Sequence, residues 1–350
     1  MSGERTLRVG LIGFGTVGQG FARIVADHGA ALAERYGVRI RIHAVVDPRF
    51  GGIAANAGFE PERLLDAAER GGFGELSADR TDLDARTAIR EVDLDVVAEL
   101  APTDLATGEP GVTHVRDALT AGRHVITTNK GPVALRFPEL LALAERNGVR
   151  IGVEGTVMSG TPTLGLATEQ LAGAGTTGLT GILNGTTNYM LGRMEAGLSF
   201  DAALAEAQAE GYAEADPSGD VDGIDAAGKV VILANLALGE PLAMSDVERR
   251  GIRDLTPEDL RAAREAGETW KLVGRLNREP DGRVRASVRP TRLPNDHPLA
   301  SVRGATNACT FHTELLGDVT IIGPGAGRLA TGYALVHDLL AIDRTRGARA

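Results

Sequence analysis

A glycine-rich turn near the start of the chain, residues 13–18, constrains the fold more than any other feature. It reads Gly13-Phe14-Gly15-Thr16-Val17-Gly18 and directly follows the apolar run 7–12, which predicts a buried strand. A helical pattern then runs from Val17 to about Arg35. In a strand–turn–helix unit of this kind the glycines allow a tight turn and the close approach of a pyrophosphate, and the helix N-terminus offers N–H groups to it. The six residues therefore predict a dinucleotide site, with a purely structural glycine turn as the alternative.

The second predicted strand, 39–46, ends at an acidic residue, Asp47, which lies 29 positions after Gly18 (47 − 18). A carboxylate here would bond the 2′-hydroxyl of the NAD ribose and repel the 2′-phosphate of NADP. Arg49 lies two residues further on and could instead bind that phosphate. A plain strand-end aspartate before Pro48 is the third interpretation, so NAD and NADP both remain open as the cofactor.

Two further strands are predicted over 94–100 and 124–127, with a helix over 113–121 between them. This alternation predicts an α/β fold with a Rossmann-type, doubly wound parallel sheet and helices on both of its faces. Ligands of such sheets bind at the carboxyl ends of the strands. Lys130 follows one of these ends in Thr128-Asn129-Lys130-Gly131 and should point into the crevice. A surface lysine is the alternative.

The strand–helix alternation stops near Ile151, and an α+β domain is expected after it. Its expected elements are a strand over 182–190 that enters a polar turn, a helix to about 238, a helix over 257–267, and strands over 284–290 and 308–315. A glycine-rich segment, 323–327, then precedes an apolar helix over 329–342. We therefore expect the chain to return to the nucleotide-binding domain, where Gly325 would help to complete the cofactor cleft. The expected boundaries are an NAD(P)-binding domain over 1–152, completed by 318–345, and a catalytic domain over 153–317.

An acidic segment, 212–229, is the strongest indication of chemistry in this second part. It ends on Lys229 and has five carboxylates within the 12 positions 214–225. The five are Glu214, Asp216, Asp220, Asp222 and Asp225. The apolar run that follows predicts a buried helix beginning near Val221. On such a helix Asp225 and Lys229, four residues apart, share one face. A carboxylate and an ammonium near the N-terminus of a buried helix are suited to binding a small polar substrate and to transferring a proton.

Composition and missing motifs exclude several classes of function. A net charge of −10 argues against a nucleic-acid partner, and the absence of an 18-residue apolar run argues against a membrane partner. One cysteine, Cys309, excludes an internal disulfide and fits a cytoplasmic protein. Gly223 to Lys229 resembles a P-loop, but Val230 stands where a hydroxyl should hold Mg²⁺, and a Ca²⁺ loop would need an acid at Lys229. Hydride transfer is the class of reaction that remains, with Lys130 or Lys229 as the proton donor.

Five segments, in this order, resemble homoserine dehydrogenase: GFGTVGQG, TTNKGPVA, ILNGTTNYM, SFDAALAEAQAEGYAEADPSGDVDGIDAAGK and GPGAG. The resemblance covers about Leu7 to Ile342, and the acidic segment is its most specific part. It implies an oxidoreductase that interconverts L-homoserine and L-aspartate 4-semialdehyde with NADPH or NADH, in threonine, methionine and isoleucine biosynthesis. It also implies a homodimer formed through the sheet of the second domain.

The resemblance also implies roles for individual residues. Gly13, Gly15 and Gly18 would hold the pyrophosphate, and Lys130 would lie between nicotinamide and substrate. The residues implied around the substrate are Glu214, Asp225, Asp220, Tyr212 and Thr186, with Lys229 at the reacting oxygen. A structural Na⁺ would be bound at Glu154, Val157, Ser159 and Thr161. Lys130 is preferred as the proton donor, and Lys229 is the alternative.

Two segments depart from the family pattern, LAPTDLATGEPG after Glu99 and VMSG at 157–160, and they leave substrate choice open. A reductase of a related amino-acid semialdehyde or hydroxy acid is therefore the second hypothesis. A non-catalytic dinucleotide-binding sensor is the third. The sequence has no room for the regulatory ACT domain of longer members, so weak or absent inhibition by threonine is expected.

Overall fold

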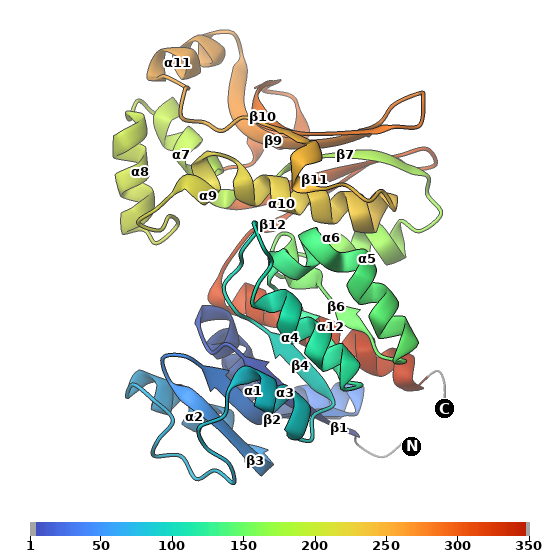
Figure 1. Cartoon of the computed structure of the whole chain (residues 1–350). Coiled ribbons are helices and arrows are strands. Elements are labelled where there is room, and N and C mark those ends of the chain that lie inside the picture. Colours follow the sequence, from blue (N-terminus) through green and yellow to red (C-terminus); the bar gives the residue numbers. More distant parts are fainter. Residues whose placement is uncertain (1–4, 348–350) are drawn as a thin grey trace. The chain divides into compact units, whose positions relative to one another are not determined.

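The protein is described here by a computed structural model that covers residues 5–347, with the side chains of 345–347 left undescribed. The chain divides into two compact units. Of the described residues, 5–160 and 327–347 belong to the first, and 161–326 belong to the second. Each unit is built around one six-stranded sheet (Figure 1).

The sheet of the first unit has the strand order β3-β2-β1-β4-β5-β6. Its strands are β1 (Arg5–Ile12), β2 (Val38–Asp47), β3 (Gly51–Phe59), β4 (Val96–Glu99), β5 (His124–Thr127) and β6 (Ile151–Gly152). All neighbours are parallel except β2 and β3, which are antiparallel. The order reverses between β1 and β4, so the crevice outside the carboxyl ends of these two strands is the expected ligand site. The predicted doubly wound sheet is confirmed.

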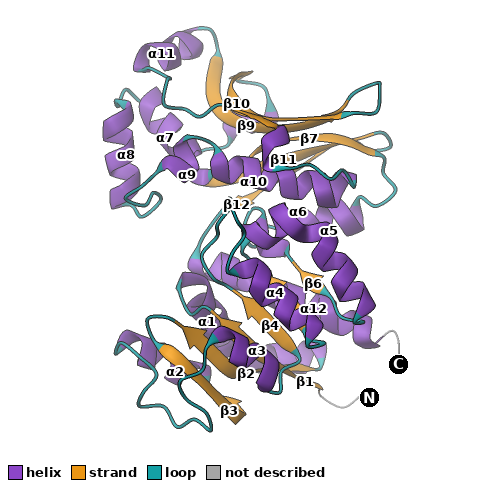
Figure 2. Ribbon diagram, viewed as in Figure 1, coloured by secondary structure: helices purple, strands orange, loops and turns teal. Residues whose placement is uncertain are grey.

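Helices cover both faces of this sheet (Figure 2). They are α1 (Thr16–Tyr36), α2 (Pro61–Glu69), α3 (Ala85–Glu91), α4 (Gly111–Thr120), α5 (Lys130–Arg146) and α12 (Arg328–Gly347), with a 3₁₀ turn, η1 (Glu154–Thr156). On one face, Leu11 of β1 shares a core with Phe21 of α1 and Leu335 of α12. On the other face, Val97 of β4 and Val125 of β5 pack with residues of α3, α4 and α5. The two cores follow from strands that are apolar on both sides.

Close contact between α1 and α12 ties the C-terminal helix to the first unit. A Cβ atom on Gly20 would lie 2.0 Å from the carbonyl oxygen of Arg328, and one on Gly332 would lie 2.6 Å from the amide nitrogen of Phe21. The two glycines therefore let the helix backbones approach closely. The return of the chain to the first unit is thus made by α12.

The sheet of the second unit has the order β12-β11-β7-β9-β10-β8. Its strands are β7 (Thr176–Ile182), β8 (Val247–Arg249), β9 (Glu268–Arg278), β10 (Val284–Pro294), β11 (Thr306–Thr313) and β12 (Gly317–Pro324). The helices are α6 (Thr163–Gly165), α7 (Gly185–Glu195), α8 (Phe200–Ala209), α9 (Ser218–Val221), α10 (Ile224–Leu233) and α11 (Pro257–Glu265). Two π turns, η2 (Leu166–Gln170) and η3 (Ala234–Leu238), and two 3₁₀ turns, η4 (Met244–Asp246) and η5 (Pro298–Ser301), complete the unit.

The first unit extends to residue 160, past the expected boundary at 152, and strands β3 and β9 were not predicted. Two further segments also differ from the prediction. The strand predicted over 182–190 ends at Ile182, and helix α7 follows, because the side chain of Asn184 caps it by accepting a hydrogen bond from the amide of Thr187. Residues 318–324 lie in β12, which pairs with β11, so they belong to the second sheet and not to the returning segment. Gly325 also lies in the second unit, where a Cβ atom would be 2.1 Å from Asn307 Oδ1.

Candidate active site

The glycine turn after β1 has the geometry of a phosphate-binding loop. Gly13 adopts φ 110°, and a Cβ atom there would lie 2.5 Å from the carbonyl oxygen of Leu100. A Cβ atom on Gly18 would lie 2.6 Å from the carbonyl oxygen of Gly13. Gly15 caps α1 without a side chain. Close packing therefore requires glycine at positions 13 and 18. Because the cap residue Gly15 has no side chain, the first N–H groups of the 21-residue helix α1 are not covered by a side-chain cap.

The carboxylate of Asp47, at the end of β2, is bonded to the glycine turn. Its Oδ2 accepts a hydrogen bond from the amide of Phe14 at 2.8 Å, and its Oδ1 accepts from the amide and Nε of Arg49 at 2.9 and 3.2 Å. Burial raises the pKa of Asp47, but these hydrogen bonds outweigh it, and the net shift of the pKa is downward. The Arg49 guanidinium is largely exposed and stacks on Phe50, 4.8 Å from the ring centre. The predicted acid is thus charged and positioned beside the turn, and its pairing with Arg49 was not predicted.

Lys130 is positioned by hydrogen bonds between the ends of β4 and β5. The hydroxyl of Thr127 donates to the carbonyl of Glu99 at 2.8 Å and accepts from the amide of Asn129 at 2.9 Å. The side chain of Asn129 caps α5 by accepting from the amide of Gly131 at 3.0 Å. Lys130 is the first residue of that helix and is partly buried. It therefore lies at the carboxyl end of the sheet, as the sequence predicts.

Lys229 is the centre of the polar cluster in the second unit. Its ammonium lies 2.8 Å from Asp225 Oδ2 and donates to the carbonyl of Leu183 at 2.6 Å, and the residue is only 6% exposed. Both charged residues are on α10, which begins at Ile224, three residues later than predicted. The four-residue spacing places them together, as the sequence analysis anticipates.

Asn184 completes this cluster and was missed by the sequence analysis. Its Nδ2 donates to Asp220 Oδ1 at 2.6 Å and to Asp225 Oδ2 at 3.0 Å. Burial raises the pKa of Asp220 and the neighbouring charge of Asp225 raises it further, although the hydrogen bond from Asn184 opposes the shift. The only signal available in the sequence was the position of this asparagine in the motif ILNGTTNYM.

The remaining predicted substrate residues lie around the cluster at different depths. Thr186 is buried, and its hydroxyl donates to the carbonyl of Tyr212 at 2.6 Å. The ring of Tyr212 is 43% exposed and packs against Tyr189, with 4.9 Å between the ring centres. Glu214 is exposed, on the loop between α8 and α9. The structure therefore brings Asp220, Asp225 and Lys229 together and leaves Glu214 and the Tyr212 ring toward solvent within this unit.

The residues implied for a structural Na⁺ surround a tight turn after η1. Glu154 and Ser159 are buried, and Met158 and Ser159 both have positive φ, 56° and 57°. Val157 is buried beside them, and Thr161 is the first residue of the second unit. Residues 5–347 contain no group of three or more His, Cys, Asp or Glu side chains placed to hold a metal. One buried carboxylate with main-chain oxygens fits Na⁺ better than a transition metal, and the Na⁺ set stays a prediction.

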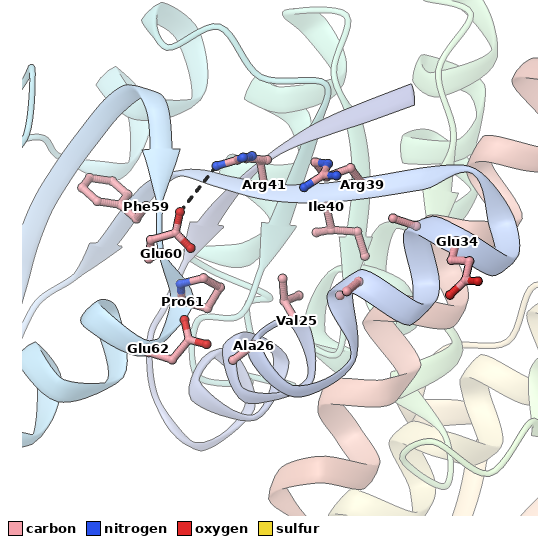
Figure 3. Close-up of a pocket in the computed structure, with 13 residues that line it drawn as sticks. Val25, Ala26, Glu34, Arg39, Ile40, Arg41, Phe59, Glu60, Pro61 and Glu62 are labelled. Carbon is pink, nitrogen blue, oxygen red and sulfur yellow. Dashed lines mark ion pairs between the residues drawn. The ribbon is translucent and has the colours of Figure 1, made fainter. Parts of the chain in front are cut away.

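Two other features of the structure lie outside the cofactor and substrate residues. A cavity of about 350 Å³ lies between α1, β2, β3 and the start of α2, and Arg41 and Glu60 form an ion pair of 3.7 Å at it (Figure 3). Its lining includes the first residues of β2, so it is at the opposite end of that strand from Asp47. Cys309 is buried in β11, and burial raises the pKa of its thiol, which argues against a role for it as a thiolate nucleophile.

Comparison with known proteins identifies the family. A family model described as homoserine dehydrogenase, NAD binding domain, matches residues 13–154, and one described as homoserine dehydrogenase matches residues 162–340. The chain belongs to the homoserine dehydrogenase family. It is therefore an NAD(P)-dependent oxidoreductase with a small-molecule substrate. Among its described residues, no helix is long and apolar enough to cross a membrane.

Several members of the family match this chain over nearly its full length. An NAD(+)-dependent homoserine dehydrogenase of Pseudomonas canavaninivorans is 44% identical over 97% of this chain and 96% of its own length. The homoserine dehydrogenase of Methanocaldococcus jannaschii is 38% identical, with 95% and 97% covered. A solved homoserine dehydrogenase of Thiobacillus denitrificans superposes with a TM-score of 0.86 at 34% identity, covering 99% of this chain and 75% of that one. A hyperthermophilic archaeal homoserine dehydrogenase in complex with NADPH gives 0.84 at 30% identity, covering 97% and 98%.

The raised pKa of Asp220 predicts a pH-dependent stability effect. Because the folded pKa lies above the unfolded one, ionisation of this carboxyl costs stability as pH rises, and the cost is absent below about pH 3.9, the usual aspartate pKa. Asp220→Asn should therefore raise the urea midpoint at pH 7 and lose this advantage near pH 3.5. Urea unfolding followed by circular dichroism at both pH values measures the difference.

The matched control is Asp222→Asn, because Asp222 is partly exposed and pairs with Arg253 at 2.5 Å. It should give no gain at pH 7. A lower midpoint for Asp220→Asn than for wild type at pH 7 would contradict the assigned shift.

Proposed function

We propose that the chain interconverts L-homoserine and L-aspartate 4-semialdehyde at the residues described above. The observation that carries the proposal is the cluster of the buried Lys229 and Asn184 with the partly buried Asp225 and Asp220, since it offers both signs of charge to a small zwitterion. The first unit would bind the cofactor and the second unit the substrate. The buried single cysteine fits a reducing compartment, and we place the enzyme in the cytoplasm.

The substrate's two charges suggest how the residues share the work. Its ammonium group requires carboxylates, for which Asp225, Asp220 and the exposed Glu214 are available, and Thr186 and Tyr212 would line the same pocket. Lys229 would donate a hydrogen bond to the reacting oxygen from a fixed position, because Asp225 and the carbonyl of Leu183 hold its ammonium. The bound nicotinamide supplies or accepts the hydride. Lys130 would exchange the proton of the substrate's hydroxyl group.

Loss of either lysine should abolish most activity. Lys130→Ala and Lys229→Met should each lower kcat for homoserine oxidation near pH 9 by at least about 100-fold, the usual contribution of one acid–base group. Initial rates with NAD⁺ and NADP⁺ measure this, with circular dichroism to show that each variant folds. Arg136→Ala, an exposed basic residue on the same helix as Lys130, is the matched control and should keep wild-type kcat.

Two results would contradict the proposal in different ways. A folded wild type that binds cofactor and oxidises another amino-acid alcohol but not homoserine would support the related semialdehyde reductase. Cofactor binding without turnover of any such substrate would support the sensor. Wild-type turnover with unaffected Lys130→Ala would keep the reaction and move the proton transfer to Lys229.

Asp47 and Arg49 should set the choice between the two cofactors. The carboxylate of Asp47 is charged beside the turn, while the charge of Arg49 is already paired with it, so we propose a preference for NAD. Asp47→Asn keeps an acceptor for the Phe14 amide and removes the charge, so it should lower the ratio of kcat/KM for NAD to that for NADP, by about 10-fold if one charge contact is involved. Arg49→Ala should raise the ratio, and a lower ratio in that variant would contradict the assignment.

We also propose that the enzyme is a homodimer formed through the face of the second sheet that α10 does not cover. On β9, a Cβ atom on Gly274 would meet Val230 of α10, so the adjacent Arg275 points to the opposite face. A polar row crosses that face in register: Thr320, Thr310, Thr180, Arg275, Ser287 and Glu248. Arg275 Nε is buried and has no hydrogen-bond partner among the described residues, and burial lowers the pKa of this guanidinium. An acceptor from a second copy would satisfy it.

A charge at the centre of this row should separate the subunits. Thr180→Glu would place two like charges near each other across a two-fold interface, so it should shift the protein from twice the chain mass to the chain mass in sedimentation velocity. Thr81→Glu, on an exposed loop of the first unit, should leave the mass unchanged. A wild type that sediments as a monomer at micromolar concentration would overturn the proposal.

A further inference from the structure

The use of lysine in this chain is highly selective. Of 37 basic residues only three are lysines, Lys130, Lys229 and Lys271, and the other 34 (37 − 3) are arginines. Two of the three belong to the proposed reaction. The third, Lys271 on β9, is 1% exposed and lies outside the residues assigned so far. A chain that uses arginine almost everywhere else therefore has a lysine at a fully buried position.

Lys271 forms a polar clamp with Asn188 of α7. Its ammonium donates to Asn188 Oδ1 at 2.9 Å and to the carbonyl of Val302 at 2.5 Å. Asn188 Nδ2 in turn donates to the carbonyls of Val302, Gly304 and Thr306 at 3.3, 2.8 and 3.3 Å. Both side chains thus join α7 to the segment 302–306, which leads into β11.

This arrangement is costly for stability. Burial and, to a smaller extent, the charge of Arg303 lower the pKa of Lys271 from 10.5 to about 8, with Glu195 opposing the shift. Because the folded pKa lies below the unfolded one, the charged amine destabilises the fold below about pH 8, and this cost is relieved as pH rises from 8 toward 10.5. A methionine would fill much of the same volume without the charge. Costs of this kind are commonly tolerated where a residue serves function.

The clamp lies one helical turn from the proposed substrate residues. Asn188 is four residues after Asn184, whose amide holds Asp220 and Asp225, and Leu183 supplies the carbonyl that holds Lys229. A Cβ atom on Gly185 would lie 2.4 Å from the carbonyl oxygen of Ala305, so the start of α7 rests directly on the backbone of 302–306. At the other end of α7, Glu195 accepts hydrogen bonds from Arg303 and Thr269 at 3.2 and 3.4 Å.

We propose that Lys271 is a positioning residue for the reaction, which holds Asn188 and thereby the start of α7 so that Leu183 and Asn184 keep Lys229 and its two carboxylates in place. The proposal rests on the proposed function. It accounts for a buried amine that lies close to the reaction residues but donates its hydrogen bonds to Asn188 and to the carbonyl of Val302.

The test compares Lys271→Met and Asn188→Leu in the homoserine oxidation assay. Lys271→Met should unfold at a urea midpoint at pH 7 no lower than wild type, while kcat/KM for homoserine falls at least about 10-fold and KM for the cofactor stays unchanged. A merely structural role would lower stability and leave kcat/KM of the folded fraction intact. Hydrogen exchange of the peptide 183–190 should be faster in Lys271→Met.

Asn188→Leu tests the same link from the other side. The double variant should lose about as much kcat/KM as one single variant, and not the product of the two losses, because both changes break one connection. A folded Asn188→Leu with wild-type kcat/KM overturns the proposal whatever Lys271→Met does, and so does unchanged hydrogen exchange of 183–190 in a folded Lys271→Met. Wild-type activity on homoserine reports separately on the proposed function.

Discussion

The hydrogen bonds of one side-chain amide organise the substrate unit. Asn184 holds Asp220 and Asp225, which approach each other although both are acidic, and this pair of carboxylates flanks a buried lysine. The negative charges of Asp220 and Asp225 repel each other. Burial and this repulsion both raise the pKa of Asp220. An amide donor and an ammonium together offset it. These interactions therefore couple three parts of the chain: the N-terminal cap of α7, the start of α10 and the segment that precedes α10.

Local features of the fold and site could be predicted from sequence. The contact of Gly18 with the carbonyl of Gly13 joins residues five positions apart (18 − 13), and the pairing of Asp225 with Lys229 is determined by the period of a helix. Both follow from spacing alone. The parallel, doubly wound arrangement of the first sheet also follows from the alternation of strands and helices, but the antiparallel edge strand β3 was not predicted.

The start of α7 and the role of Asn184 could not be predicted, because they depend on contacts between distant parts of the chain. The motif ILNGTTNYM reads as a turn because Gly, Thr and Asn favour turns, but the same residues cap and begin α7 once β11 and the loop before it pack against them. Asn184 lies 36 and 41 positions from the carboxylates it holds, so no local pattern could identify it. The pairing of Asp47 with Arg49 was missed for another reason. The two residues are only two positions apart, but each alone has a reasonable role in cofactor choice.

The placement of the three lysines has a chemical consequence. Lys229 and Lys271 are both buried, so Lys130, which is partly buried, is the most exposed of the three lysines. An acylating reagent that attacks amines would therefore modify lysine side chains of this enzyme mainly at the carboxyl end of β5. Its rate of reaction would report whether the cofactor covers that position.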